Sequence, residues 1–84
     1  MVALSPIEFA DGRPFYRQIA GQLRKLILEG QLGPGDRVPS ELEMVNYYQC
    51  SRGTVRQARF LLELEGWIET SRGRGAFVRE APPH

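Results

Sequence analysis

Apolar residues recur at helical spacing along residues 14–30, with polar residues between them. Proline is favoured in the first turn of a helix and glycine just after the last turn, so Pro14 and Gly30 mark the two ends. The pattern therefore predicts an amphipathic helix. Its expected buried positions are Phe15, Ile19, Leu23, Leu26 and Ile27.

A connector rich in glycine and proline, residues 31–39, leads to a second helical segment. We expect Leu32 and Val38 to attach this connector to the core as a short extended segment. Ser40, followed three residues later by Glu43, forms a capping box, which predicts that a helix begins at Ser40. This helix is short, and its expected buried positions are Leu42, Val45 and Tyr48.

Ser51 is a second serine of the type that begins helices, and it follows the previous helix after a short turn. The third helix is predicted over residues 52–65, and Gly66 ends it. Two helices joined by a turn of three or four residues have the spacing of a helix-turn-helix. The expected inward positions of the third helix are Val55, Ala58 and Leu62.

The last segments predict a β-hairpin. Residues 67–70 and 76–79 are rich in residues that favour strands, and the glycines of residues 71–75 suit the turn between them. We call this hairpin the wing. Three helices followed by a two-stranded wing predict an α+β fold, mainly α, of the winged helix-turn-helix type.

Length and composition narrow the classes of function. The chain has 84 residues, of which 42% are hydrophobic, enough for one small domain with a modest core. No apolar run approaches the roughly 20 residues of a membrane span, so we expect no membrane partner. The single cysteine, Cys50, fits a reducing cytoplasm, and we expect it to fill an apolar slot. A redox-sensing thiol is the alternative role for Cys50.

Catalysis finds little support in the sequence. The only histidine is His84, in the predicted tail, so no Ser–His or Cys–His pair is available. No cluster has the spacing of metal ligands. We therefore expect no enzymatic activity, no metal and no cofactor.

Positive charge is concentrated in the C-terminal part of the chain. The chain as a whole has a formal net charge of +1, but residues 51–79 hold six arginines and three glutamates, a net charge of +3. Arginine binds phosphates and guanine edges through two parallel hydrogen bonds. A nucleic-acid surface is therefore one interpretation of this charge, and a solvated face is the other.

The start of the third helix is the first candidate for DNA contact. In a helix-turn-helix the second helix lies in the major groove and its N-terminal residues touch base edges. Arg52 has the chemistry to bind a guanine, while Ser51, Thr54 and Arg56 suit phosphates. The alternative is that Ser51 is only a cap and that the arginines form ion pairs with the glutamates at positions 63 and 65.

The tip of the wing and the start of the second helix are further candidates. Arg72, Gly73 and Arg74 alternate long cations with a residue that allows close approach to a phosphate or the minor groove. An ordinary soluble turn is the alternative. Ser40 is a candidate for backbone phosphate contact, and capping alone explains it equally well.

Five ordered segments together resemble the GntR family of bacterial transcription regulators, and the resemblance covers about residues 14–79. They are PFYRQIA (14–20), GQLGPGDRVPSE (30–41), SRGTVRQA (51–58), EGWI (65–68) and GRGAFV (73–78). The resemblance implies an N-terminal winged-helix DNA-binding domain, usually followed by a C-terminal domain that binds a metabolite and dimerises. It also implies repression from inverted-repeat operators, with release when the metabolite binds. By position it places DNA contacts on Ser51, Arg52, Thr54, Arg56, Arg72, Gly73 and Arg74.

The chain departs from the family pattern at four places. Leu42 stands where the family usually has an arginine that touches DNA. Gly53 replaces a polar residue and weakens its helix by about 1 kcal/mol relative to alanine. Arg59 replaces a core leucine, and we expect Phe60 or Leu61 to cover the gap. Residues 46–50 replace a blander turn, which leaves the packing of the second helix open.

The expected organisation is a flexible arm (1–13), a DNA-binding domain (14–80) and a tail (81–84), with the helix-turn-helix at about 40–59 and the wing at about 67–79. We expect no effector domain in this chain, which would be either a shortened fragment or a stand-alone DNA-binding protein. An effector metabolite is expected only if a C-terminal domain exists.

The expected function is sequence-specific binding of duplex DNA as part of a cytoplasmic, nucleoid-associated regulator, most simply a repressor. The alternative is a winged-helix module that binds protein and not DNA. An inverted-repeat operator favours a homodimer on DNA, whereas the lack of a dimer-forming domain favours a monomer in solution. The operator sequence, the metabolite and the choice between repression and activation stay open.

Overall fold

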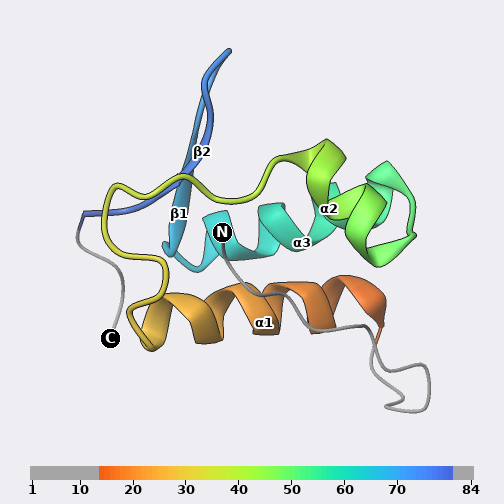
Figure 1. Cartoon of the computed structure of the whole chain (residues 1–84), viewed down its shortest axis with the longest axis horizontal. Helices are drawn as coiled ribbons and strands as arrows, with labels where there is room; N and C mark the ends of the chain where they lie inside the picture. Colours follow the sequence, from red (N-terminus) through yellow and green to blue (C-terminus); the bar gives the residue numbers. More distant parts are fainter. Residues whose placement is uncertain (1–13, 81–84) are drawn as a thin grey trace.

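Three helices and one antiparallel pair of strands make up residues 14–80, the part of the chain that the computed structural model describes. They are α1 (Phe15–Leu28), α2 (Glu41–Tyr48), α3 (Arg52–Leu64), β1 (Ile68–Ser71) and β2 (Gly75–Val78), shown in Figure 1. This order confirms the mainly helical α+β fold with a two-stranded wing. The arm predicted for residues 1–13 and the tail predicted for residues 81–84 lie outside the described residues.

Helix α1 has nearly the limits that its flanking residues predict. Pro14 is the N-cap, and Glu29 is the C-cap. Gly30 follows with a φ of +81°, a left-handed conformation that favours glycine and ends the helix. Four of the five predicted inward positions are buried, and Phe15 is half-buried. The buried residues of α1 are Gln18, Ile19, Ala20, Leu23, Leu26 and Ile27.

Helix α2 buries Tyr48 and packs Val45 against the core, as predicted, but it buries Met44 in place of Leu42. Met44 is fully buried and Tyr48 is buried, whereas Leu42 is 58% exposed and Val45 is half-buried. Met44 and Tyr48 are four residues apart and therefore share one face of the helix. Leu42 lies two residues from Met44, almost on the opposite face, so the prediction of a buried Leu42 is wrong.

Helix α3 confirms the predicted pattern. The side chain of Ser51 caps its first turn, and the three predicted inward residues, Val55, Ala58 and Leu62, are fully buried. Glu65 is the C-cap, and Gly66 follows with a φ of +84°. The turn before α3 contains Gln49 with a φ of +55°. A left-handed residue at that position ends α2 and lets the next helix begin after two residues.

The core is built around α3. This helix packs against α1, α2 and β1. Figure 1 shows α1 on one side of α3 and the wing projecting in the opposite direction. Trp67 and Ile68 continue the core from the end of α3 into the wing. None of the three helices in residues 14–80 is long and apolar enough to cross a membrane.

The two strands of the wing pair in antiparallel register, from Ile68 opposite Val78 to Ser71 opposite Gly75. Each strand lies one residue closer to the turn than predicted. The connector before α2 adds a short third segment, because the N–H of Val38 donates to the carbonyl of Ala76 at 2.8 Å. Leu32 and Val38 are buried, as predicted. Strand β2 is therefore hydrogen-bonded both to β1 and to the connector.

Candidate nucleic-acid interface

The N-terminus of α3 is capped by Ser51 and has no acidic residue in its own first turn. The N–H of Thr54 donates to Oγ of Ser51 at 3.1 Å, and the two hydroxyl oxygens lie 3.0 Å apart. Ser51 is exposed, and Thr54 is half-buried. No acidic residue lies in the first turn of α3, so the positive end of the helix dipole is not compensated within the helix. This terminus suits an anion such as a phosphate.

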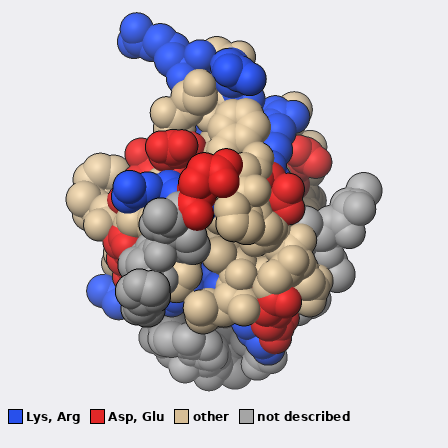
Figure 2. Space-filling model, turned by 90° about the vertical axis from the view of Figure 1, so that its left-hand side faces the viewer, with Lys and Arg blue, Asp and Glu red and all other residues tan. Residues whose placement is uncertain are grey.

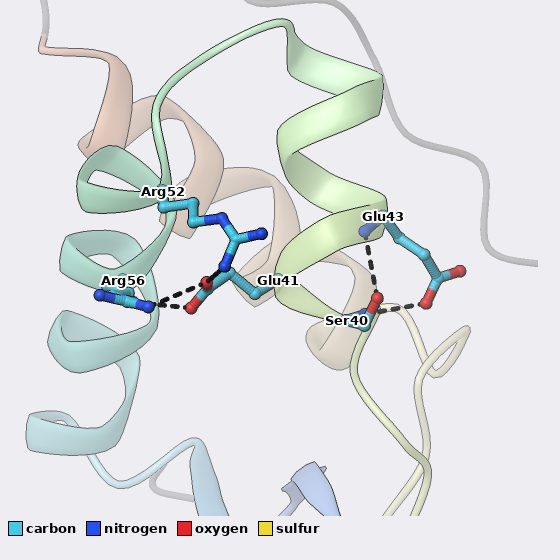
Figure 3. Close-up of polar contacts among 5 residues, drawn as sticks. All are labelled: Ser40, Glu41, Glu43, Arg52 and Arg56. Carbon is cyan, nitrogen blue, oxygen red and sulfur yellow. Dashed lines mark hydrogen bonds and ion pairs between the residues drawn. The ribbon is translucent and has the colours of Figure 1, made fainter.

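The N-terminus of α2 is electrostatically different. Its capping box is complete: the N–H of Glu43 donates to Oγ of Ser40 at 3.1 Å, and the N–H of Ser40 donates to Oε1 of Glu43 at 2.9 Å (Figure 3). The hydrogen bond from the backbone of Ser40 holds the pKa of Glu43 below its ordinary value. Glu41 adds a second carboxylate to this first turn. Capping therefore explains Ser40, and the two acids make this terminus the less favourable one for a phosphate.

Arg52 and Arg56 extend from successive turns of α3 toward Glu41, the first residue of α2 (Figure 3). Both arginine side chains are 65% exposed. Arg56 donates to both carboxylate oxygens of Glu41, with Nε–Oε2 at 2.8 Å and Nη2–Oε1 at 3.2 Å. Nη1 of Arg52 lies 3.7 Å from Oε1 of Glu41, so its guanidinium keeps its donors for another partner.

Both members of the close pair stay charged at neutral pH. The hydrogen bond from Arg56 is the main reason that the pKa of Glu41 lies below its ordinary value. The same bond raises the pKa of Arg56. Glu41 is therefore an ionised carboxylate under physiological conditions, and it is the residue of this site that the sequence does not single out. It lies 15 positions before Arg56, and only the packing of α2 on α3 brings them together.

The ion pairs suggested for the arginines with Glu63 and Glu65 are wrong. Glu63 accepts a hydrogen bond from the hydroxyl of Thr70 at 2.7 Å. Glu65 forms an ion pair with Arg24 at 2.7 Å, which joins the end of α3 to α1. Both glutamates lie near the C-terminal end of α3, far along the helix from its first turns.

The second group of candidate DNA-contact residues lies at the tip of the wing. Arg72, Gly73 and Arg74 are exposed in the turn between β1 and β2. The N–H of Arg74 donates to the carbonyl of Ser71 at 3.0 Å, and Gly73 has a φ of +77°, which favours glycine. Figure 2 shows Lys and Arg side chains covering this projecting end of the molecule, with most of the acidic groups on that face lying below it.

Arg37, in the connector, lies against the wing and was not predicted. Gly75 has a φ of +113°, and a Cβ added to it would lie 3.2 Å from Nε of Arg37. Arg37 forms an isolated antiparallel bridge with Phe77 of β2. Nothing in the local sequence indicates this contact, because the partners lie about 40 positions apart. Arg37 thus adds a guanidinium from outside the wing, beside the start of β2.

The structure shows what surrounds Gly53 and Arg59, two of the departures from the family pattern. Gly53 is exposed, and a Cβ there would meet only Oγ of Ser51 at 3.8 Å. Arg59 is half-buried, and its Nε is buried without a hydrogen-bond partner. Leu61 packs against the core, whereas Phe60 is exposed, so Leu61 covers the gap.

A family model and curated relatives match this chain. The model described as bacterial regulatory proteins, gntR family, matches residues 15–78. The HTH-type transcriptional repressor YtrA of Bacillus subtilis is 43% identical over 80 residues, which cover 95% of this chain and 59% of the relative. The arabinose metabolism transcriptional repressor of Geobacillus stearothermophilus is 41% identical over 70 residues, covering 83% of this chain and 19% of the relative. The chain thus spans only part of the length of these repressors.

Solved structures of transcription regulators are also similar to this chain. The AraR DNA-binding domain in complex with operator ORX1 has a TM-score of 0.84 at 26% identity, covering 93% of this chain and 99% of that one. YtrA from Sulfolobus acidocaldarius, a GntR-family transcription factor, also has a TM-score of 0.84, at 35% identity, with coverages of 89% and 79%. With the family match over residues 15–78, these likenesses show that the chain belongs to the GntR family of bacterial regulatory proteins and has the fold of its winged-helix DNA-binding domain.

Proposed function

We propose that this chain binds duplex DNA in a sequence-specific manner, with α3 in the major groove and the wing along the adjacent backbone or minor groove. The observation that supports this most is the start of α3, where two arginines that are each 65% exposed adjoin a helix terminus without an acid in its first turn. A groove-inserted helix contacts base edges with its N-terminal residues. A neighbouring structure with the same fold is described as bound to an operator.

The site residues divide into two roles. Arg52 has a guanidinium that is not hydrogen-bonded to Glu41, so it is the candidate for a guanine edge. Ser51, Thr54 and Arg56 are candidates for phosphates that set the register of the helix. At the wing, Arg72 and Arg74 would bind phosphate or the minor groove, while the glycine between them allows close approach. Ser40 is the weakest candidate because its hydroxyl already caps α2.

The larger protein context is part of the same proposal. The repressor names of the relatives support repression from an inverted-repeat operator by a cytoplasmic, nucleoid-associated regulator, with a homodimer on the DNA. An effector metabolite would act through a further domain, since the relatives are longer than this chain. The proposal includes no catalytic step.

The test compares Arg52→Ala with Arg72→Ala. A duplex is first enriched from a random pool with the wild-type chain, and both variants are then titrated against that duplex and a random one by fluorescence anisotropy. Arg52→Ala should lose most affinity for the enriched duplex, because a bidentate guanine contact contributes about 1–3 kcal/mol of discrimination. Arg72→Ala should weaken both duplexes about equally and lower the salt slope by about 1.

Two outcomes would contradict the proposal. Binding that does not change with salt would exclude arginine–phosphate contacts, because those release counterions. An equal, uniform loss in both variants would remove the distinction between base contact and backbone contact. Failure of the wild-type chain to enrich any duplex would instead favour a protein-binding module.

A further inference from the structure

One carboxylate lies within a group of guanidiniums at the proposed DNA surface. Glu41, at the start of α2, faces Arg52 and Arg56 on successive turns of α3 (Figure 3). The positive charge of Arg59, on the next turn, also acts on Glu41. The side chain of Glu41 is only 21% exposed, while those of Arg52 and Arg56 are each 65% exposed. The cations therefore face solvent, and the anion lies beneath them, between α2 and α3.

The contact between Arg56 and Glu41 has the geometry that arginine also uses for phosphate. Nε and Nη2 of Arg56 bind the two carboxylate oxygens at 2.8 and 3.2 Å, which is a bidentate pair. A phosphate that is to bind the same edge of this guanidinium must displace the carboxylate. Arg52, at 3.7 Å, is attracted by the same carboxylate but is not hydrogen-bonded to it.

We propose that Glu41 is a specificity-determining residue: it occupies Arg56, which weakens binding to the phosphates of any duplex, and it orients Arg52 toward the base edge of the correct site. This inference rests on the proposed function. Phosphates are present on every duplex, the correct one included, so holding Arg56 on an internal carboxylate lowers affinity for all sequences about equally. A correct site adds base contacts to Arg52, which the carboxylate leaves with its donors available. Discrimination is a difference of affinities, and an Arg52 oriented for a base contact that only the correct site offers raises it.

The simplest competing explanation is that Glu41 only joins α2 to α3. An exposed ion pair between two helices contributes little to stability, and its loss should leave the DNA surface unchanged. The two explanations differ in what they predict for DNA. A purely structural pair predicts no change in the number of phosphate contacts, whereas the release of Arg56 predicts an increase.

The test compares Glu41→Gln with Glu43→Gln. Both substitutions remove one negative charge from the first turn of α2, and glutamine at position 43 still completes the capping box. The full chain is titrated by fluorescence anisotropy against a random-sequence duplex and against the duplex enriched by the wild type, at several salt concentrations. Thermal melts followed by circular dichroism show that each variant is folded.

Glu41→Gln should bind the random duplex several-fold more tightly than the wild type, with a salt slope steeper by about 1, because one more phosphate is neutralised. The affinity ratio between the enriched and random duplexes should fall. Glu43→Gln should change both affinities less and leave the slope unaltered. The steeper slope should disappear in the double variant Glu41→Gln/Arg56→Gln, which has no released guanidinium at position 56.

Equal slopes and equal affinity ratios for Glu41→Gln and Glu43→Gln, with normal wild-type binding, would overturn this inference alone. A wild-type chain that binds neither duplex would overturn the proposed function together with the inference. If Glu41→Gln does not fold, Glu41→Asp is compared with the wild type instead, since it keeps the charge but shortens the reach to Arg56. A salt slope for Glu41→Asp that is no steeper than that of the wild type would then count against the inference.

Discussion

Leu42 and Met44 are two residues apart on α2, but the side chain of Leu42 faces solvent and that of Met44 lies in the core. Leu42 is 58% exposed, whereas Met44 has no exposed surface and belongs to the core. The free energy of burying an apolar side chain is proportional to the area removed from water. Two apolar residues of similar size should therefore make very different contributions to stability.

We expect Leu42→Ala to change the free energy of unfolding by less than about 0.5 kcal/mol, as is usual for surface positions. Met44→Ala should lower it by about 2–5 kcal/mol, because it leaves a cavity in the core. Urea titrations of both variants measure the difference, with each serving as the control for the other. A loss of similar size in both variants would mean that Leu42 is buried in solution.

Residue type alone predicts the capping serines and the arginines of the candidate site, but not the partners of those arginines. Ser40 and Ser51 cap their helices as expected, because capping depends on residues within one turn. Leu42 was wrongly placed in the core because the face that α2 buries depends on how it docks against α3. Glu41 was missed for the same reason, since its contact with Arg56 exists only after docking.

The wing is an element whose position depends on a segment outside it. The connector donates a hydrogen bond from Val38 to Ala76, and β2 returns one from Val78 to Asp36 at 2.9 Å. Gly75 begins β2 with a φ of +113°, directly beside the guanidinium of Arg37. A side chain at position 75 would therefore strain the backbone and meet Arg37.

We expect Gly75→Ala to disturb the wing and weaken DNA binding, because alanine disfavours positive φ and its Cβ would lie 3.2 Å from Nε of Arg37. Gly21→Ala is the matched control: position 21 lies within α1, and a Cβ there meets nothing within 4 Å. The control should raise stability by about 0.5–1 kcal/mol and leave DNA binding unchanged. Anisotropy titrations and thermal melts measure both effects. Undiminished DNA binding by Gly75→Ala would show that the wing tolerates the change.

The elements themselves were largely predictable, because each helix and strand is marked by local signals. Both strands were placed within one residue of their observed positions. The pairing of the connector with β2 was not predicted beyond a short extended segment attached to the core. Its hydrogen bonds join residues 36–38 to residues 76–78, and no periodicity or turn motif reports a contact over such a separation.

At the scale of the whole molecule, one buried hydroxyl joins two helices. Oη of Tyr48, on α2, donates to Oε1 of Gln22, on α1, at 2.6 Å. Burial is the main reason that the pKa of Tyr48 lies above its ordinary value of 10.0. The folded state therefore disfavours tyrosinate, which would lose this donated hydrogen bond and place a charge in the core.

This difference in pKa makes the stability of the fold depend on alkaline pH. Below about pH 10 the phenol is neutral in both states, so its contribution to folding is fully present. Above that pH the unfolded chain loses the proton while the folded chain keeps it, so folding must take up a proton and stability falls as the pH rises. Thermal melts from about pH 8 to about pH 11 should therefore show a falling midpoint for the wild type.

Tyr48→Phe separates the hydroxyl from the rest of the core. At neutral pH it should lower stability by about 1 kcal/mol, because one hydrogen bond is lost. At alkaline pH its midpoint should fall less than that of the wild type, since phenylalanine has no proton to lose. Tyr47→Phe, at an exposed position beside Tyr48, is the control and should retain most of the wild-type decline, because burial and not Tyr47 is the largest cause of the raised pKa of Tyr48. If Tyr48→Phe declines as steeply as the wild type, another group governs the alkaline stability of the molecule.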